Sequence, residues 1–220
     1  MKRIFLGLCL ALAACGGQDE APAREANSLD GIRNYLERAF ADNDGATGGI
    51  CGDSSLQGDV VGDVPGRISG CGIPNAVRLT SVDGVALSQP SLMNCATASA
   101  LKTWINDGAR PAVKRQGGGI SGLRVAAHYS CRTRNNQPGA KISEHGRGKA
   151  IDISAILLAD GSEMSVLRDW GSGKKGRALR KMHGAACGTF GTVLGPESDR
   201  FHRDHFHFDT AKHGNGSYCR

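Results

Sequence analysis

Six cysteines constrain the fold of this chain more than any other feature of its sequence. The 220 residues include eight cysteines, of which Cys9 and Cys15 lie in an N-terminal leader. The others are Cys51, Cys71, Cys95, Cys131, Cys187 and Cys219. An even number in an exported domain predicts a disulfide framework, here of three bonds. Sequence does not fix the pairing, and we expect neighbours to pair, as Cys51–Cys71, Cys95–Cys131 and Cys187–Cys219. A structural zinc site is the alternative, but the chain has no Cys-x-x-Cys pair.

The leader indicates export. Lys2 and Arg3 precede an apolar run over residues 4–14 that is too short to span a bilayer. We therefore interpret residues 1–14 as a signal peptide. The run ends in Leu-Ala-Ala-Cys at residues 12–15, which resembles the lipobox of bacterial lipoproteins. We expect lipid on Cys15 and a location in the periplasm of the bacterial cell envelope, anchored to a membrane. Ordinary secretion with a chance cysteine is the alternative.

Composition indicates a single loop-rich domain. A chain of 220 residues is long enough to bury one substantial core. Glycine is frequent, at 32 residues, whereas only 5% of the residues are aromatic. The net charge is +6, but lysine and arginine form no run of five or more, so nucleic acid is not an expected partner. A basic surface of this kind suits an anionic membrane or the acidic polymers of a cell wall.

Hydrophobic spacing predicts short elements in an irregular order. Along the chain we expect a lipidated cysteine and flexible tether (15–27), an N-terminal helix from Ser28 followed by a glycine-rich extension of loops (28–70), and the main domain (71–220). Within that domain the patterns predict strands at 76–82, 119–127, 150–156 and 206–208, and helices at 92–106 and 172–187. This mixture is typical of the α+β class.

The first chemical motif is the segment Ser-Glu-His-Gly-Arg-Gly-Lys-Ala-Ile-Asp at residues 143–152. It holds His145 and Asp152, both able to bind a divalent metal, on either side of a bend that Gly146 and Gly148 permit. Asp152 follows an apolar strand pattern, and a buried carboxylate needs a partner or a metal. A surface loop with a hydrogen-bonded aspartate is the alternative.

The second motif places three histidines within residues 202–209. His205 and His207 share one face of a predicted strand, and Phe206 and Phe208 alternate with them toward the core. Two histidines on one face suit a metal and its water better than a core; a pH-sensitive surface patch is the alternative. Three protein ligands with an open position are the catalytic pattern for zinc, which lowers the pKa of bound water to about 7.

Residues 143–152 fit the pattern S-x-H-x-x-G-x-A-x-D, and with the later H-x-H they resemble the LAS-type metallopeptidases. That group includes D-Ala-D-Ala carboxypeptidases and dipeptidases, peptidoglycan endopeptidases and the hedgehog signalling domain. The chain is still more similar to the bacterial extensin-like C-terminal family over about residues 71–220. The segments that carry this likeness are 71–73, 130–135, 143–145, 190–196, 204–207 and 218–220.

The resemblance implies one zinc ion bound by His145, Asp152 and His207. It implies that His205 assists catalysis beside the metal and that Asp204 is the general base. Asp204 and His207 would lie on opposite faces of a regular strand, so a turn or bulge is expected at Asp204. His202 competes for the role of base.

The resemblance also extends to the substrate. It implies that Arg132 binds a substrate carboxylate or a polarised carbonyl oxygen, with Arg134 able to share that task, whereas Ser143 braces the site. The implied fold is a small antiparallel sheet that carries the zinc site, with flanking helices and an LAS/hedgehog-like arrangement. The remaining histidines, His128, His183 and His213, are expected at the surface or behind the ligands.

These features together predict a zinc-dependent peptidase of peptidoglycan, an endopeptidase on cross-link peptides rather than a carboxypeptidase. The expected partners are peptidoglycan and, through lipid on Cys15, a membrane. A non-catalytic zinc-containing module that binds the wall or a protein partner is the main alternative, and metal capture in the envelope is a weaker one.

Overall fold

The computed structural model describes residues 49–114, 116–214 and 216–220. The expected signal peptide, lipidated Cys15, tether and N-terminal helix lie outside the described residues. Within the described part, no helix has both the length and the apolar character needed to cross a membrane.

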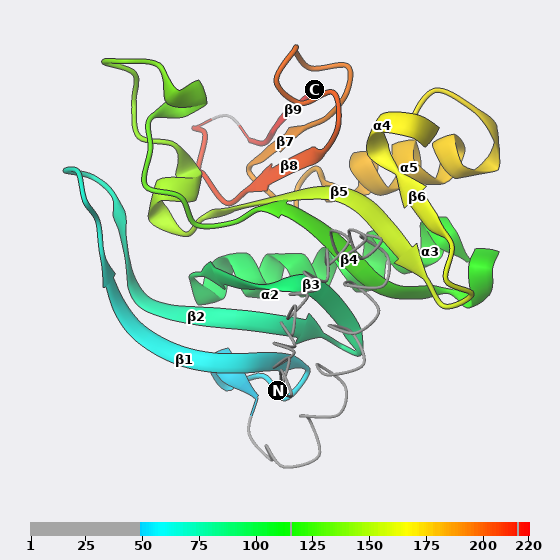
Figure 1. Cartoon of the computed structure of the whole chain (residues 1–220), viewed down its shortest axis with the longest axis horizontal. Coiled ribbons are helices and arrows are strands. Elements are labelled where there is room, and N and C mark those ends of the chain that lie inside the picture. The colour runs from blue at the N-terminus through cyan, green and yellow to red at the C-terminus, as the bar shows by residue number, and fades with distance from the viewer. Residues whose placement is uncertain (1–48, 115, 215) are drawn as a thin grey trace, which may run out of the picture.

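A single nine-stranded sheet organises the described part of the chain (Figure 1). Its strand order is β1-β2-β3-β4-β5-β8-β7-β9, with β6 paired to β5. The bounds are β1 Leu56–Pro65, β2 Gly72–Val82, β3 Val85–Met93, β4 Ile120–Ala127, β5 Ala150–Leu158, β6 Glu163–Ser165, β7 Thr192–Leu194, β8 Phe206–Asp209 and β9 Tyr218–Cys219.

The α-helices are α2 Cys95–Trp104, α3 Arg110–Val113, α4 Val166–Asp169 and α5 Gly173–Ala186, and a π-helical turn, Ile105–Ala109, joins α2 to α3. Short 3-10 turns occur at Ile50–Gly52, Gln116–Gly118, Arg134–Asn136 and Glu144–Arg147. Strands mixed with a few helices and three disulfides make this an α+β domain, as the sequence predicts.

The expectation of a small antiparallel sheet is wrong. The pairs β3–β4 and β7–β9 are parallel, and the sheet is large and mixed. Parallel neighbours need a long crossover, and between β3 and β4 the chain forms α2 and α3. The helix predicted at 92–106 therefore begins later, because Leu92 and Met93 complete β3.

The expectation of loops over residues 42–70 is also wrong where β1 forms. β1 pairs along β2 as a long hairpin, visible at the lower left of Figure 1. Gly58 and Gly62 have positive φ angles of 148° and 83°, and the register shifts at both. These bulges break the alternation of side chains, so a strand-period search does not detect β1.

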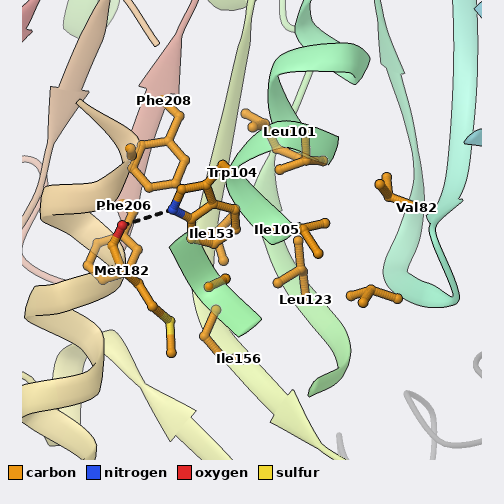
Figure 2. Close-up of a cluster of buried hydrophobic side chains, with 14 of the residues drawn as sticks. Val82, Leu101, Trp104, Ile105, Leu123, Ile153, Ile156, Met182, Phe206 and Phe208 are labelled. Atoms are coloured by element: carbon orange, nitrogen blue, oxygen red, sulfur yellow. Dashed lines mark hydrogen bonds between the residues drawn. The ribbon is translucent and has the colours of Figure 1, made fainter. Parts of the chain in front are cut away.

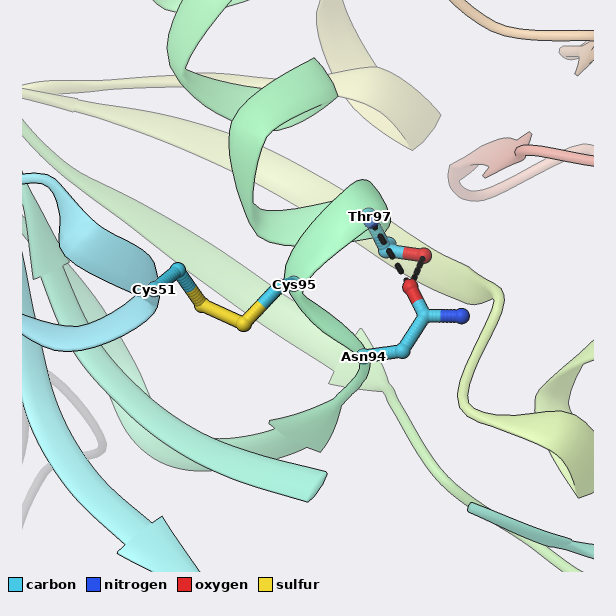
Figure 3. The surroundings of a disulfide bond; sticks show 4 residues. All are labelled: Cys51, Asn94, Cys95 and Thr97. Carbon is cyan, nitrogen blue, oxygen red and sulfur yellow. Dashed lines mark hydrogen bonds between the residues drawn. A yellow bond between two sulfur atoms is a disulfide. The ribbon is translucent and has the colours of Figure 1, made fainter. Parts of the chain in front are cut away.

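The start of α2 is fixed by a cap and a disulfide. The side chain of Asn94 accepts hydrogen bonds from the backbone N–H and the hydroxyl of Thr97, both at 2.9 Å (Figure 3). Cys95, the first residue of the helix, is bonded to Cys51, with Cα atoms 5.5 Å apart.

The disulfides correct two of the three expected pairings. Only Cys187–Cys219 joins sequence neighbours. The other bonds are Cys51–Cys95 and Cys71–Cys131. Cys71 precedes β2 and Cys131 follows β4. Because β2 is antiparallel to β3 and β3 is parallel to β4, the start of β2 and the end of β4 lie on the same side of the sheet, at the ends of the strands.

The hydrophobic core lies between the sheet and the helices α2 and α5. Trp104 of α2 is fully buried, packs edge-on against Phe208 of β8 at 5.0 Å, and donates its indole N–H to the carbonyl of Met182 of α5 at 2.8 Å (Figure 2). Phe208 packs against Trp104 of α2 and Phe206 against His183 of α5, whereas His207 between them contacts Asp152, so the predicted alternation along β8 is confirmed. The helices therefore cover one face of β8, and His207 lies on the other.

Replacing both cysteines of the Cys51–Cys95 bond with serine is expected to lower the free energy of unfolding by about 2–4 kcal/mol, because the bond closes a long loop of the unfolded chain. Urea denaturation of the oxidised protein measures this loss. In the reduced protein the same substitutions should change stability little. Peptide mapping without reduction should recover Cys51 linked to Cys95, and recovery of Cys51 linked to Cys71 would contradict the structure.

Candidate metal centre

Three residues from two separate segments of the chain meet at the centre of the sheet. Asp152 of β5 lies directly opposite His207 of β8 in the strand register. His145 approaches from the 3-10 turn Glu144–Arg147, which ends in Gly148 with a positive φ of 64° just before β5. One potential ligand atom from each residue lies within 4.8 Å of the others, and all three residues are buried. The structure thus brings together the three ligands that the sequence motifs suggest.

The contacts within this cluster are short. His145 Nε2 lies 3.1 Å from Asp152 Oδ2, and His207 Nδ1 lies 2.8 Å from Asp152 Oδ1. The same two histidine nitrogens are 3.2 Å apart. Two imidazoles and one carboxylate therefore converge on a common point.

The ring nitrogens that point away from the cluster have the acceptors that metal-bound histidines usually have. His145 Nδ1 donates to the backbone carbonyl of His128 at 2.7 Å, and His207 Nε2 donates to Asp209 Oδ2 at 3.1 Å. A carbonyl or carboxylate oxygen only accepts, so in a neutral ring the lone pair is left on the inner nitrogen. Metal-bound histidines are held by such outer acceptors, and two nitrogens with one carboxylate are ligands that zinc prefers.

The electrostatics of the cluster favour a positive charge. Burial opposes ionisation of Asp152, but hydrogen bonds from His145 and His207 outweigh it and hold the pKa of that carboxyl well below its usual range. Burial likewise opposes the charged form of His207, yet Asp152 and Asp209 raise its pKa to about 9. A proton or a cation at this point is therefore stabilised by two carboxylates.

A cleft of about 520 Å³ opens onto the cluster. The expected substrate-binding residues Arg132, Arg134 and Ser143 all line it, as do the expected catalytic residues His202 and His205. His205 Nε2 is 3.6 Å from Asp152 Oδ2, and the ring of His202 lies 5.6 Å from that of His207. The cleft joins the candidate ligands to polar groups able to bind substrate and transfer protons.

Asp204 takes a different place from the general base that we expected. It lies in the turn before β8, where a turn or bulge was needed, but it is not among the residues that line the cleft. Its side chain is 65% exposed, and Oδ1 accepts from His205 Nδ1 at 2.8 Å. Asp204 can therefore orient His205, and the structure does not bring it to the cluster itself.

Several residues of the cleft were not predicted from the sequence. His213, expected at the surface or behind a ligand, lines the cleft and contacts the Thr192 hydroxyl through Nε2 at 2.9 Å. Tyr218 lies beside Thr192 because β9 pairs with β7. Glu144 is buried at 3.3 Å from Arg147. The position of Glu144 between Ser143 and His145 could have indicated from the sequence that it lies at the site. Thr192 and Tyr218 reach the cleft through strand pairing, which no local sequence pattern indicates.

The model of the family described as extensin-like protein C-terminus matches residues 58–220. The chain belongs to this family. The match includes all residues that line the cleft and begins within β1, upstream of the boundary at residue 71 expected for the extensin-like domain. No curated protein and no solved structure matches the chain.

Gly148→Ala is expected to lower the free energy of unfolding of the extensin-like domain by about 2–4 kcal/mol, from a strained positive φ and overpacking. An added Cβ would lie 2.5 Å from Ile73 Cδ1. Gly161→Ala is the matched control, because Gly161 also has a positive φ, 82°, but open space around it. Its expected cost is about 1–2 kcal/mol. Urea unfolding measures both, and equal losses would contradict the packing of Gly148 on Ile73.

Zinc binding at about pH 7.5 is expected to release at least one proton, because a metal ligand must be deprotonated. The pKa of His207, about 9, means that this ring is protonated below that pH in the absence of a metal. Proton release should therefore fall by about one proton as pH rises through the pKa of His207. Titration calorimetry in buffers of different ionisation enthalpy counts the protons, and zinc binding without proton release would contradict the assignment.

Proposed function

We propose that this extensin-like domain is a zinc-dependent peptidase that hydrolyses peptidoglycan peptides, most suitably the cross-links between stems. The observation that carries the proposal is the convergence of His145, Asp152 and His207 beside a cleft that holds three further histidines and two arginines. A structural zinc site has four protein ligands and is closed, whereas three ligands beside a cleft leave a position for the reaction.

The chemistry supplied by bound zinc is Lewis acidity, which polarises a carbonyl group and makes water nucleophilic near neutral pH. The chain would provide the other requirements of peptide hydrolysis. His205 is held by Asp204 through Nδ1 at 2.8 Å, with Nε2 directed toward the cluster. A histidine so placed can donate a hydrogen bond to developing negative charge or move a proton.

In this proposal, the loop that carries Arg132 and Arg134 binds the substrate. Ser143 N–H donates to the carbonyl of Arg132 at 3.0 Å, so this loop is tied directly to the segment that bears His145. Guanidinium groups bind carboxylates through paired hydrogen bonds. The stem peptides of peptidoglycan carry carboxylates, so they are suitable ligands for this side of the cleft.

The expected location in the cell envelope is consistent with peptidoglycan as the substrate. Three disulfides are typical of an exported domain. The expected lipid on Cys15 would hold the domain at a membrane of the cell envelope, within reach of cross-linked wall polymer. This placement favours an endopeptidase over a carboxypeptidase.

Digestion of intact peptidoglycan tests the proposal. Protein lacking residues 1–27 should release cross-linked dimers as monomers in a zinc-dependent manner, read by liquid chromatography and mass spectrometry with and without a chelator. His207→Ala should lose both zinc and activity, whereas His205→Ala should keep zinc and lose roughly 10²–10⁴-fold in turnover.

The products distinguish the alternatives. Removal of only a terminal residue would identify a carboxypeptidase. One bound zinc without cleavage of any wall type would refute the peptidase and favour a binding module. Asp59→Asn is a suitable control, because that side chain is 67% exposed on β1 and is not part of the cleft.

A further inference from the structure

A second carboxylate–histidine pair lies in the wall of the cleft, between β7 and β8. Asp199 Oδ1 is 2.8 Å from His202 Nδ1, and the His202 side chain is only 12% exposed. Asp199 Oδ1 also accepts the backbone N–H of Phe201 at 2.7 Å, so the carboxylate is fixed from two directions. Both residues line the cleft.

The bond to Asp199 determines the hydrogen-bonding role of His202. Because a carboxylate only accepts, Nδ1 of His202 must carry the proton. In the neutral ring the lone pair is then on Nε2, at the opposite edge. The ring centroid lies 5.3 Å from that of His205 and 5.6 Å from that of His207, so the His202 ring lies beside the metal cluster.

His205 is placed differently. Its Nδ1 donates to Asp204 Oδ1 at 2.8 Å, and its Nε2 faces a second carboxylate, Asp152 Oδ2, at the longer distance of 3.6 Å. His202 has a carboxylate at one nitrogen only. The two histidines therefore offer complementary roles, His205 as a donor and His202 as an acceptor.

We propose that Asp199 is a positioning residue that holds His202 with Nε2 as the proton acceptor of the cleft. The inference rests on the proposed peptide hydrolysis. In that reaction His202 Nε2 accepts a proton from the attacking water as the C–O bond forms. The same proton passes to the amine nitrogen as the peptide C–N bond breaks, and Asp199 stays ionised throughout. One water is consumed, and an acid and an amine are released.

A simpler role for Asp199 is to cap the turn through Phe201 N–H, and Asp199→Asn separates the two roles. The amide oxygen of asparagine can still accept that backbone bond, but the negative charge beside His202 is lost. In the full chain, solubilised in detergent and loaded with zinc, Asp199→Asn is expected to lower kcat by about tenfold to a hundredfold. KM and zinc content should stay unchanged.

A double-mutant cycle tests whether Asp199 acts through His202. Asp199→Asn should have no further effect on kcat in a His202→Gln background. Asp204→Asn is the matched comparison, because Asp204 contacts His205 and its loss should persist in that background. An equal loss from Asp199→Asn with and without His202 would overturn the proposal.

Nitrogen-15 NMR of labelled histidines in the full chain gives a readout that needs no turnover. His202 should show the tautomer with hydrogen on Nδ1, and Asp199→Asn should shift it toward a mixture. The tautomer with hydrogen on Nε2 in the unsubstituted protein would overturn the inference, even if peptidoglycan is hydrolysed. Absence of hydrolysis with the Nδ1–H tautomer present would refute the proposed function while supporting the Asp199–His202 pair.

Discussion

The buried carboxylate of Asp152 is the constraint on which the central part of this structure depends. It lies on β5, a strand that is buried along almost its whole length, where an unpaired charge is costly. His145 and His207 compensate for that cost with contacts of 3.1 Å and 2.8 Å. The compensation requires a fixed register between β5 and β8, because a slip of one residue would turn His207 into the core.

The register is held from the opposite face of β8. Phe206 and Phe208 are fully buried there, and Phe208 packs against Trp104 of α2. The indole N–H of Trp104 is satisfied by the carbonyl of Met182 of α5, which joins the two helices that cover this face. Core packing and the polar cluster thus support each other through alternate side chains of one short strand.

A second set of contacts fixes the turn that carries His145. Ser130 N–H donates to the His145 carbonyl at 3.3 Å, and the carbonyl of His128 accepts from the ring of His145. The neighbouring residue of this loop, Cys131, is bonded to Cys71 at the end of the β1–β2 hairpin. Sites that bind metal or substrate need such support, because small displacements of a ligand weaken binding strongly. The disulfide-linked extension before residue 71 therefore contributes to the candidate site as well as to the fold.

The sequence by itself determined which residues could form the candidate site and the class of the fold. The spacing of His145 and Asp152 around two glycines, and the alternation of His205 and His207 with two phenylalanines, depend only on local backbone geometry. Tertiary structure decided the rest. Two disulfide pairings, the parallel pairing of β3 with β4, and the bulged strand β1 depend on which segments meet in space. The place of Asp204 behind His205 and the contact of Asp199 with His202 also depend on tertiary structure. A side chain in a turn can point in several directions until its neighbours pack around it.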